Sequence, residues 1–158
     1  MPARLTPMSL RVSITMKESI DEVWAVVSDI ADHVNWMQDA AEIRFLTEQR
    51  SGVGTRFECD TVVGPLKTTD IMEITRWKPG RSIGVRHEGA VTGSGVFLIE
   101  PNASGGTTFT WAEHLTFPIW MGGPVGAAAA TPILTLIWRR NLKTLADRVT
   151  QRSSASKV

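Results

Sequence analysis

Residues 10–29 read LRVSITMKESIDEVWAVVSD, and within this segment the hydrophobic period changes from that of a strand to that of a helix. Apolar and polar residues alternate up to Lys17, as in a strand with one buried face. Ser19 and Glu22 then have the spacing of a capping box, in which each side chain binds a free backbone amide of the other residue. Apolar residues recur at helical spacing up to Asp29. We therefore predict a half-buried strand followed at once by a short helix, with a second short helix over 33–39.

The middle of the chain repeats short β-like segments separated by turn signals rich in Gly, Pro or Asn. The predicted strands are 42–48, 55–63, 66–77, 81–87, 91–100 and 107–117. Connections as short as these favour an antiparallel meander.

A long helix is predicted to close the chain. Thr131 is its expected N-cap and Pro132 its first residue, and apolar residues recur at helical spacing from Ile133 to Val149. The expected fold class is therefore α+β: a seven-stranded antiparallel sheet, two short helices after the first strand, and a long C-terminal helix. We expect an N-terminal extension over 1–8, a single domain over 9–150 and a flexible polar tail over 151–158.

Several segments, taken in order, resemble the helix-grip fold of the START-like or SRPBCC superfamily, which includes the birch pollen allergen and bacterial polyketide cyclase/dehydrase-like proteins. They are SIDEVWAVVSD at 19–29, the Asp29 to Trp36 spacing, GVGTRF at 52–57, WKPGRSI at 77–83, GGTTFTW at 105–111 and NLKTLADRV at 141–149. The resemblance implies that a curved sheet wraps the last helix and encloses an apolar cavity.

Residues 115–138 carry no charge, in a chain of which 21% is Asp, Glu, Lys or Arg. The stretch is long enough for a membrane helix, but its three prolines and three glycines disfavour one. We expect it to be mostly enclosed, as a lid and cavity wall whose small residues leave volume free and allow a hinge.

Composition narrows the function classes. A net charge of +1, without basic runs, gives no nucleic-acid footprint. The single Cys59 excludes an intramolecular disulfide, and without a signal-peptide pattern we expect a cytoplasmic protein. We see no GxSxG, P-loop or complete GxGxxG motif, and the three histidines lack metal-ligand spacing, so no cofactor or metal is expected.

Side-chain alternation predicts which residues face the cavity. Taking Phe109, Trp111 and Leu115 as the concave face of the last strand places Glu113 on that face and His114 outside. The expected ligand-binding residues are Phe57, Cys59, Met72, Ile83, Val85, His87, Phe97, Ile99, Trp111, Glu113, Trp120, Leu134 and Trp138.

Glu113 and His87 are the candidates for catalysis. A carboxyl group in an apolar cavity has a raised pKa, and a nearby imidazole opposes that shift, so the two could bind a polar ligand end or exchange protons. The structural alternative is that Glu113 lies near the strand end in water and that His87 is a solvated or hydrogen-bonded edge residue.

Three functions remain open. The preferred hypothesis is binding, transport or sensing of a small hydrophobic molecule, such as a lipid, polyketide, sterol-like or quinone-like compound. The second is a polyketide cyclase, aromatase or dehydrase that uses polar cavity residues. The third is an interaction module that contacts a protein or transiently a membrane surface, with Trp120 and Met121 at its tip.

Overall fold

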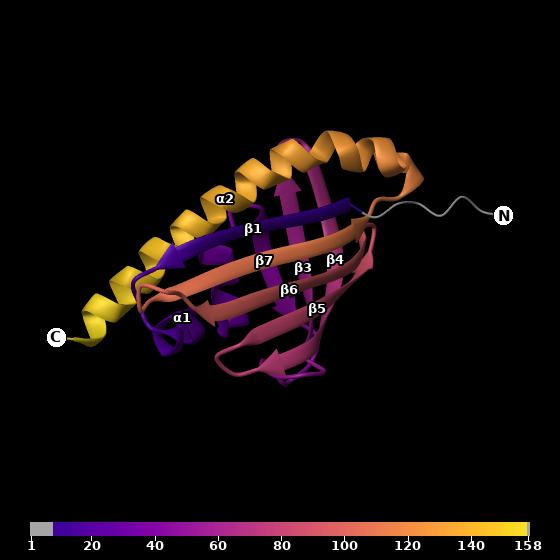
Figure 1. Ribbon diagram of the computed structural model, residues 1–158. Coiled ribbons are helices and arrows are strands. Elements are labelled where there is room, and N and C mark those ends of the chain that lie inside the picture. The colour runs from indigo at the N-terminus through magenta and orange to yellow at the C-terminus, as the bar shows by residue number, and fades with distance from the viewer. Residues whose placement is uncertain (1–7, 158) are drawn as a thin grey trace.

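The computed structural model describes residues 8–157, which form one antiparallel sheet gripping a long helix (Figure 1). The strands are β1 (Met8–Met16), β2 (Ala40–Phe45), β3 (Arg56–Val63), β4 (Leu66–Lys78), β5 (Ser82–Gly89), β6 (Thr92–Pro101) and β7 (Thr107–Thr116). The helices are α1 (Ile20–Val27), the 3-10 turns η1 (Ile30–Asn35) and η2 (Ile119–Met121), and α2 (Gly123–Ser156). The α+β helix-grip prediction is confirmed. The predicted extension over 1–8 lies almost wholly outside the described residues.

The strand order is β1-β7-β6-β5-β4-β3-β2, so each strand after β2 pairs with its neighbour in sequence and β1 closes the far edge against β7. Short turns account for the meander, because tight connections join antiparallel neighbours. The sheet curves, and α2 crosses it obliquely on one side (Figure 1).

The predicted capping box begins α1. The Glu22 carboxylate accepts a hydrogen bond from the Ser19 amide at 2.8 Å, and the Glu22 amide donates to the Ser19 hydroxyl at 3.3 Å. Val23, Val26 and Val27 are fully buried, so the helix is fixed by its apolar face as well as by its cap. The predicted second helix is present as η1 but begins three residues earlier than expected.

Aromatic side chains pack together between the sheet and the middle of α2. Trp138 of α2 stacks on Trp111 of β7, with ring centroids 4.2 Å apart and planes 10° from parallel. Trp36 packs edge-on against Phe109 and Trp111, and Phe97 contacts both Phe109 and Trp111. The C-terminal half of α2 adds Leu142, Leu145 and Val149, all essentially inaccessible to water.

The start of α2 differs from the prediction. The helix begins at Gly123, with Pro124 in its first turn, and Pro132 lies inside it. Gly122 makes the tight entry possible, because its φ of 92° favours glycine and an added Cβ would lie 2.9 Å from the Gly126 backbone. The predicted start at Thr131-Pro132 is wrong, because Pro124 is an equally suitable first-turn proline and lies eight residues earlier in the sequence.

The end of α2 also differs, because the helix continues to Ser156 where we expected a polar tail from 151. Ser153 is buried and donates a hydrogen bond to the Glu22 carboxylate, which lowers the pKa of Glu22. Arg148 binds the Asp32 carboxylate of η1 through two nitrogens. These polar contacts hold the last turns of α2 against α1 and η1.

The expectation that residues 115–138 are mostly enclosed is wrong. Five side chains in this run are more than half exposed: Ile119 82%, Trp120 69%, Val125 78%, Ile133 55% and Leu136 53%. The sheet covers only one side of α2, so within residues 8–157 no other element packs on the outer side of its first half. Across residues 8–157, no helix has the length and hydropathy needed to span a bilayer.

Candidate functional site

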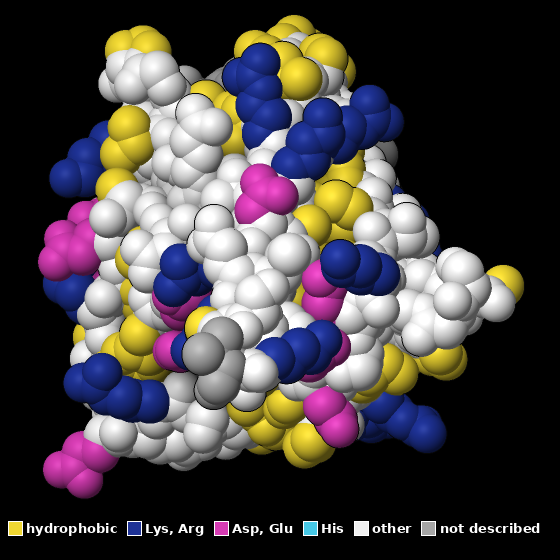
Figure 2. Space-filling model, turned by 90° about the vertical axis from the view of Figure 1, so that its left-hand side faces the viewer, with side chains coloured by type: hydrophobic (Ala, Val, Ile, Leu, Met, Phe, Trp, Pro, Cys, Tyr) yellow, Lys and Arg dark blue, Asp and Glu magenta, His cyan; other side chains and the backbone are white. Residues whose placement is uncertain are grey.

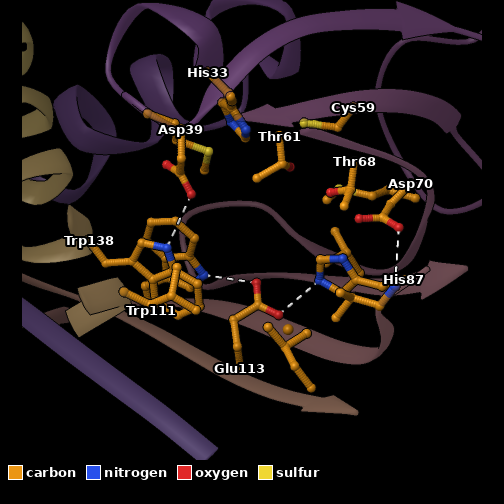
Figure 3. Close-up of a pocket in the computed structure, with 18 of the residues that line it drawn as sticks. His33, Asp39, Cys59, Thr61, Thr68, Asp70, His87, Trp111, Glu113 and Trp138 are labelled. Atoms are coloured by element: carbon orange, nitrogen blue, oxygen red, sulfur yellow. Dashed lines mark hydrogen bonds and ion pairs between the residues drawn. The ribbon is translucent and has the colours of Figure 1, made fainter. Parts of the chain in front are cut away.

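A cavity of about 320 Å³ lies between the concave side of the sheet and α2, within the size range of small-molecule sites (Figure 3). Most of its lining is aliphatic or aromatic. Of the predicted ligand-binding residues, the cavity is lined by Phe57, Cys59, Met72, Ile83, Val85, His87, Phe97, Trp111, Glu113, Leu134 and Trp138.

Two predicted residues lie elsewhere. Ile99 faces the correct side of β6 and is 3% exposed, but it does not line the cavity, because alternation fixes a face and not a position along it. Trp120 is 69% exposed on η2 and does not line the cavity, whereas its neighbour Met121 does.

Strand pairing brings the polar candidates together. Glu113 of β7 is opposite Gly95 of β6, and His87 of β5 is opposite Gly93 of β6. A Cβ on Gly95 would lie 2.4 Å from a Glu113 carboxylate oxygen, so the missing side chain leaves the room in which Glu113 reaches across β6. Glu113 and His87 both lie on the concave side, as predicted. Both are buried, so the alternative in which Glu113 lies in water at a strand end is wrong.

Glu113, His87 and Trp111 form a closed polar centre in this apolar space (Figure 3). Trp111 donates its indole N–H to Glu113 Oε1 at 2.9 Å, and His87 Nε2 lies 2.8 Å from Glu113 Oε2. Glu113 and His87 are 5% and 9% exposed. Both carboxylate oxygens of Glu113 are therefore occupied by donors from the protein.

The charges around His87 favour its protonated form. Burial alone would lower the pKa of His87, but the hydrogen bond and charge of Glu113, with the charge of Asp70, outweigh burial and raise it. Asp70 sits on β4 beside this pair, and burial raises the pKa of its carboxyl group. The Asp70 carboxylate also accepts a hydrogen bond of 3.4 Å from the Val91 amide.

A second polar group lies where the cavity meets α2. Asp39 accepts hydrogen bonds from Asn141 at 2.7 Å and from the Trp138 indole at 3.3 Å. Burial raises the pKa of Asp39, and the nearby charge of Glu113 adds to the effect. Asn141, fully buried, also accepts from the Gln38 amide, so it holds the chain before β2 against α2.

Sequence reasoning missed several polar wall residues. Neither Asp39 nor Asp70 belongs to a sequence motif. Asp70 is two residues from the predicted Met72 on β4, so alternation places both side chains on the same face of that strand. His33, the first residue of the predicted second helix, also lines the cavity, and its Nε2 lies 2.8 Å from the Val27 carbonyl oxygen. Burial lowers the pKa of His33, so it is neutral and donates to that carbonyl.

The chemistry of the remaining candidates is limited. Burial raises the pKa of the Cys59 thiol to about 12, which leaves almost no nucleophilic thiolate near neutral pH. Within residues 8–157, His, Cys, Asp and Glu side chains form no group of three or more arranged to hold a metal ion. The site can bind an apolar molecule, orient one polar end of it, and move a proton through His87.

Comparison with known proteins adds a family and a fold. A family model described as polyketide cyclase/dehydrase and lipid transport matches residues 7–150. No curated protein matches the sequence significantly.

The solved structures that match are distant in sequence. Protein TTHA0849 of Thermus thermophilus is 18% identical, with 92% of this chain and 99% of that chain covered and a TM-score of 0.73. The Zhui aromatase/cyclase of Streptomyces sp. R1128 is 17% identical, with 94% of each chain covered and a TM-score of 0.68. The di-domain aromatase/cyclase StfQ of steffimycin biosynthesis is 12% identical, with 96% of this chain but only 53% of that one covered and a TM-score of 0.76. At these identities the likeness concerns the fold.

Proposed function

Because the chain belongs to the polyketide cyclase, dehydrase and lipid transport family, we propose that it binds a small, mainly hydrophobic molecule in its cavity as a carrier or sensor. The observation that carries this proposal is the closed polar centre. Both Glu113 oxygens already accept hydrogen bonds from Trp111 and His87, so this carboxylate is not free to act as a base on a bound ligand. Such a site favours holding a ligand over deprotonating it.

The arrangement of the walls suggests how the ligand lies. Its polar end faces His87 and Asp70, where the protein offers an imidazolium N–H and a carboxyl group of raised pKa. Its apolar body runs along Met72, Trp138 and Leu134 toward α2. A neutral molecule with one carbonyl, hydroxyl or enol group fits these walls, because a charged group on the ligand would lose its water in the cavity without gaining an ionic partner.

We propose that the protein is located in the cytoplasm, since its only cysteine, Cys59, is a buried free thiol.

A matched pair of alanines on α2 tests ligand binding. Ala130 lines the cavity, whereas Ala128, half a turn away, is exposed and does not. Ala130→Phe should abolish the fluorescence gain of N-phenyl-1-naphthylamine, a neutral apolar dye, and Ala128→Phe should keep it. Absence of dye binding to the unmodified protein, together with no co-purifying small molecule in native mass spectrometry, would refute the proposal.

The second candidate function is a cyclase or dehydrase, and the buried His87–Glu113 pair is the specific observation in its favour. A protonated His87 can donate a proton to a ligand carbonyl while the Asp70 carboxylate, which also lines the cavity, accepts the proton that the adjacent C–H loses; Glu113 holds His87 in place and charged. An alkyl 1,3-diketone tests this chemistry. An acid/base enzyme should accelerate exchange of its central methylene protons in D₂O, and His87→Gln should slow that exchange by about 10²- to 10⁴-fold. A carrier should leave the exchange rate at its value in buffer.

A further inference from the structure

We infer that the exposed side of η2 and of the first half of α2 docks on an anionic lipid bilayer, and that the cavity exchanges its ligand there. This docking face consists of Ile119, Trp120, Val125, Ile133 and Leu136, each more than half exposed. The inference rests on the proposed ligand-binding function, because it names the place from which the ligand comes.

The docking face is continuous along the helix surface. Val125, Ala129, Ile133 and Leu136 are spaced four, four and three residues apart, so they follow one side of α2. That side is opposite to the one carrying Trp138, which is buried. Ile119 and Trp120 extend the face beyond the helix start, at the end of the molecule where α2 overhangs the sheet (Figure 1). An apolar helix side with a terminal tryptophan is typical of segments lying in the bilayer interface.

The charges beside this face match an anionic surface. Arg139, Arg140 and Lys143 are exposed on the turns of α2 that directly follow it. No acidic residue occurs between Glu113 and Asp147 in the sequence, so nothing neutralises these three cations from within the segment. At the opposite end of the molecule, Lys and Arg are interspersed with Asp and Glu (Figure 2). The asymmetry favours phospholipid headgroups as the partner.

The docking face adjoins the cavity. Met121, Ala130, Ile133 and Leu134 line the cavity from η2 and α2, and Ile133 is at the same time 55% exposed. Across from them, Leu66 at the turn between β3 and β4 also lines the cavity and is 42% exposed. A bilayer covering this end would let an apolar molecule pass between these side chains without crossing water.

A second copy of the chain fits this face less well than a bilayer. Parallel packing of two such helices would bring Arg139, Arg140 and Lys143 near their own copies. Antiparallel packing would place those cations against the apolar Val125 and Ala129 of the other chain, where they lose water without gaining a partner. Headgroups instead accept the cations while the apolar side chains enter the acyl region.

Vesicle flotation tests the inference. The full chain should float with vesicles of equal parts phosphatidylcholine and phosphatidylglycerol, much less with pure phosphatidylcholine, and less as salt is added. Arg139→Gln with Arg140→Gln should weaken partitioning about 25-fold, since one cation near such a surface contributes about fivefold. Ile119→Ser with Trp120→Ser should weaken it by at least about tenfold. Neither pair lines the cavity.

Val53→Ser is the matched control. Val53 is 60% exposed but lies in the turn between β2 and β3, at the opposite end of β3 from the cavity mouth at Leu66. This variant should bind vesicles as the unmodified protein does. Equal binding to both vesicle types, an equal loss in Val53→Ser, or self-association by light scattering without flotation would each overturn the inference. Binding of N-phenyl-1-naphthylamine without vesicles reports separately on the cavity, so it distinguishes failed docking from failed ligand binding.

Discussion

Replacing Glu113 by Gln should destabilise the protein in acid and have little effect in alkali. The carboxylate of Glu113 favours the protonated form of His87 through a hydrogen bond of 2.8 Å, in a site where both side chains are less than one-tenth exposed. Gln keeps the shape and can still accept from the Trp111 indole. Its amide N–H, however, can face His87 Nε2 only when that nitrogen is unprotonated. The variant therefore loses the anion and leaves burial to lower the pKa of His87.

The free energy of unfolding depends on pH because the pKa of His87 differs between the folded and the unfolded protein. In the unmodified protein the folded pKa of His87 is raised, so its stabilising contribution is complete below the ordinary value of about 6.5 and disappears as pH rises through the raised pKa. In Glu113→Gln, folding below about pH 6.5 must instead strip a proton from His87. A hydrogen bond to a charged group contributes about 1.5–3 kcal/mol, which is the expected loss of unfolding free energy near pH 5.5. The loss should shrink toward zero, or reverse, above the raised pKa, because a buried charge has then been removed.

Urea unfolding at a series of pH values measures this difference, and NMR titration of the His87 ring gives its pKa directly. Glu88→Gln is the matched control, because Glu88 follows His87 on the other side of β5 and forms partly exposed ion pairs with Arg56 and Arg86. Its cost should stay below about 1 kcal/mol. A loss in Glu113→Gln that does not change with pH, or an unchanged pKa of His87, would refute the ion-pair argument.

Three further substitutions test the polar centre at Glu113, the hydrogen bonds of Asn141 and the packed side of α2. Gly95→Ala should break the polar centre, because its Cβ would collide with the Glu113 carboxylate; the His87 pKa should fall while circular dichroism stays unchanged, and a His87 titration like that of the unmodified protein would contradict this. Asn141→Leu should cost about 1–3 kcal/mol in urea unfolding, since the buried Asp39 carboxylate and the Gln38 amide lose their partner. Leu145→Ala, at 0% exposure, should cost about 2–5 kcal/mol through the void it leaves, whereas Leu136→Ala, on the exposed side of the same helix, should cost well under that.

The sequence predicted the fold well because each element is specified locally. Alternation in the strands, the Ser19–Glu22 capping box and the short turns all point to the same meander, and alternation also placed Glu113 and His87 on the concave side. The position of a residue along that side depends on register and on the curvature of the sheet, which is why Ile99 was wrongly assigned to the cavity. Asp39 and Asp70 were missed because a lone Asp has no local pattern that distinguishes a buried side chain from a solvated one.

The prediction that residues 115–138 are mostly enclosed is wrong because the two halves of α2 have different surroundings. Its second half is fixed by the apolar Leu142, Leu145 and Val149 and by the Arg148–Asp32 ion pair. Its first half has the cavity on one side and, on the other, an apolar surface that no element within residues 8–157 covers. The exposed side chains of that surface contribute little to the packed core. A contiguous exposed apolar patch beside the cavity is better explained by a partner than by the core. Substitutions there should therefore change vesicle binding while leaving the urea midpoint in place.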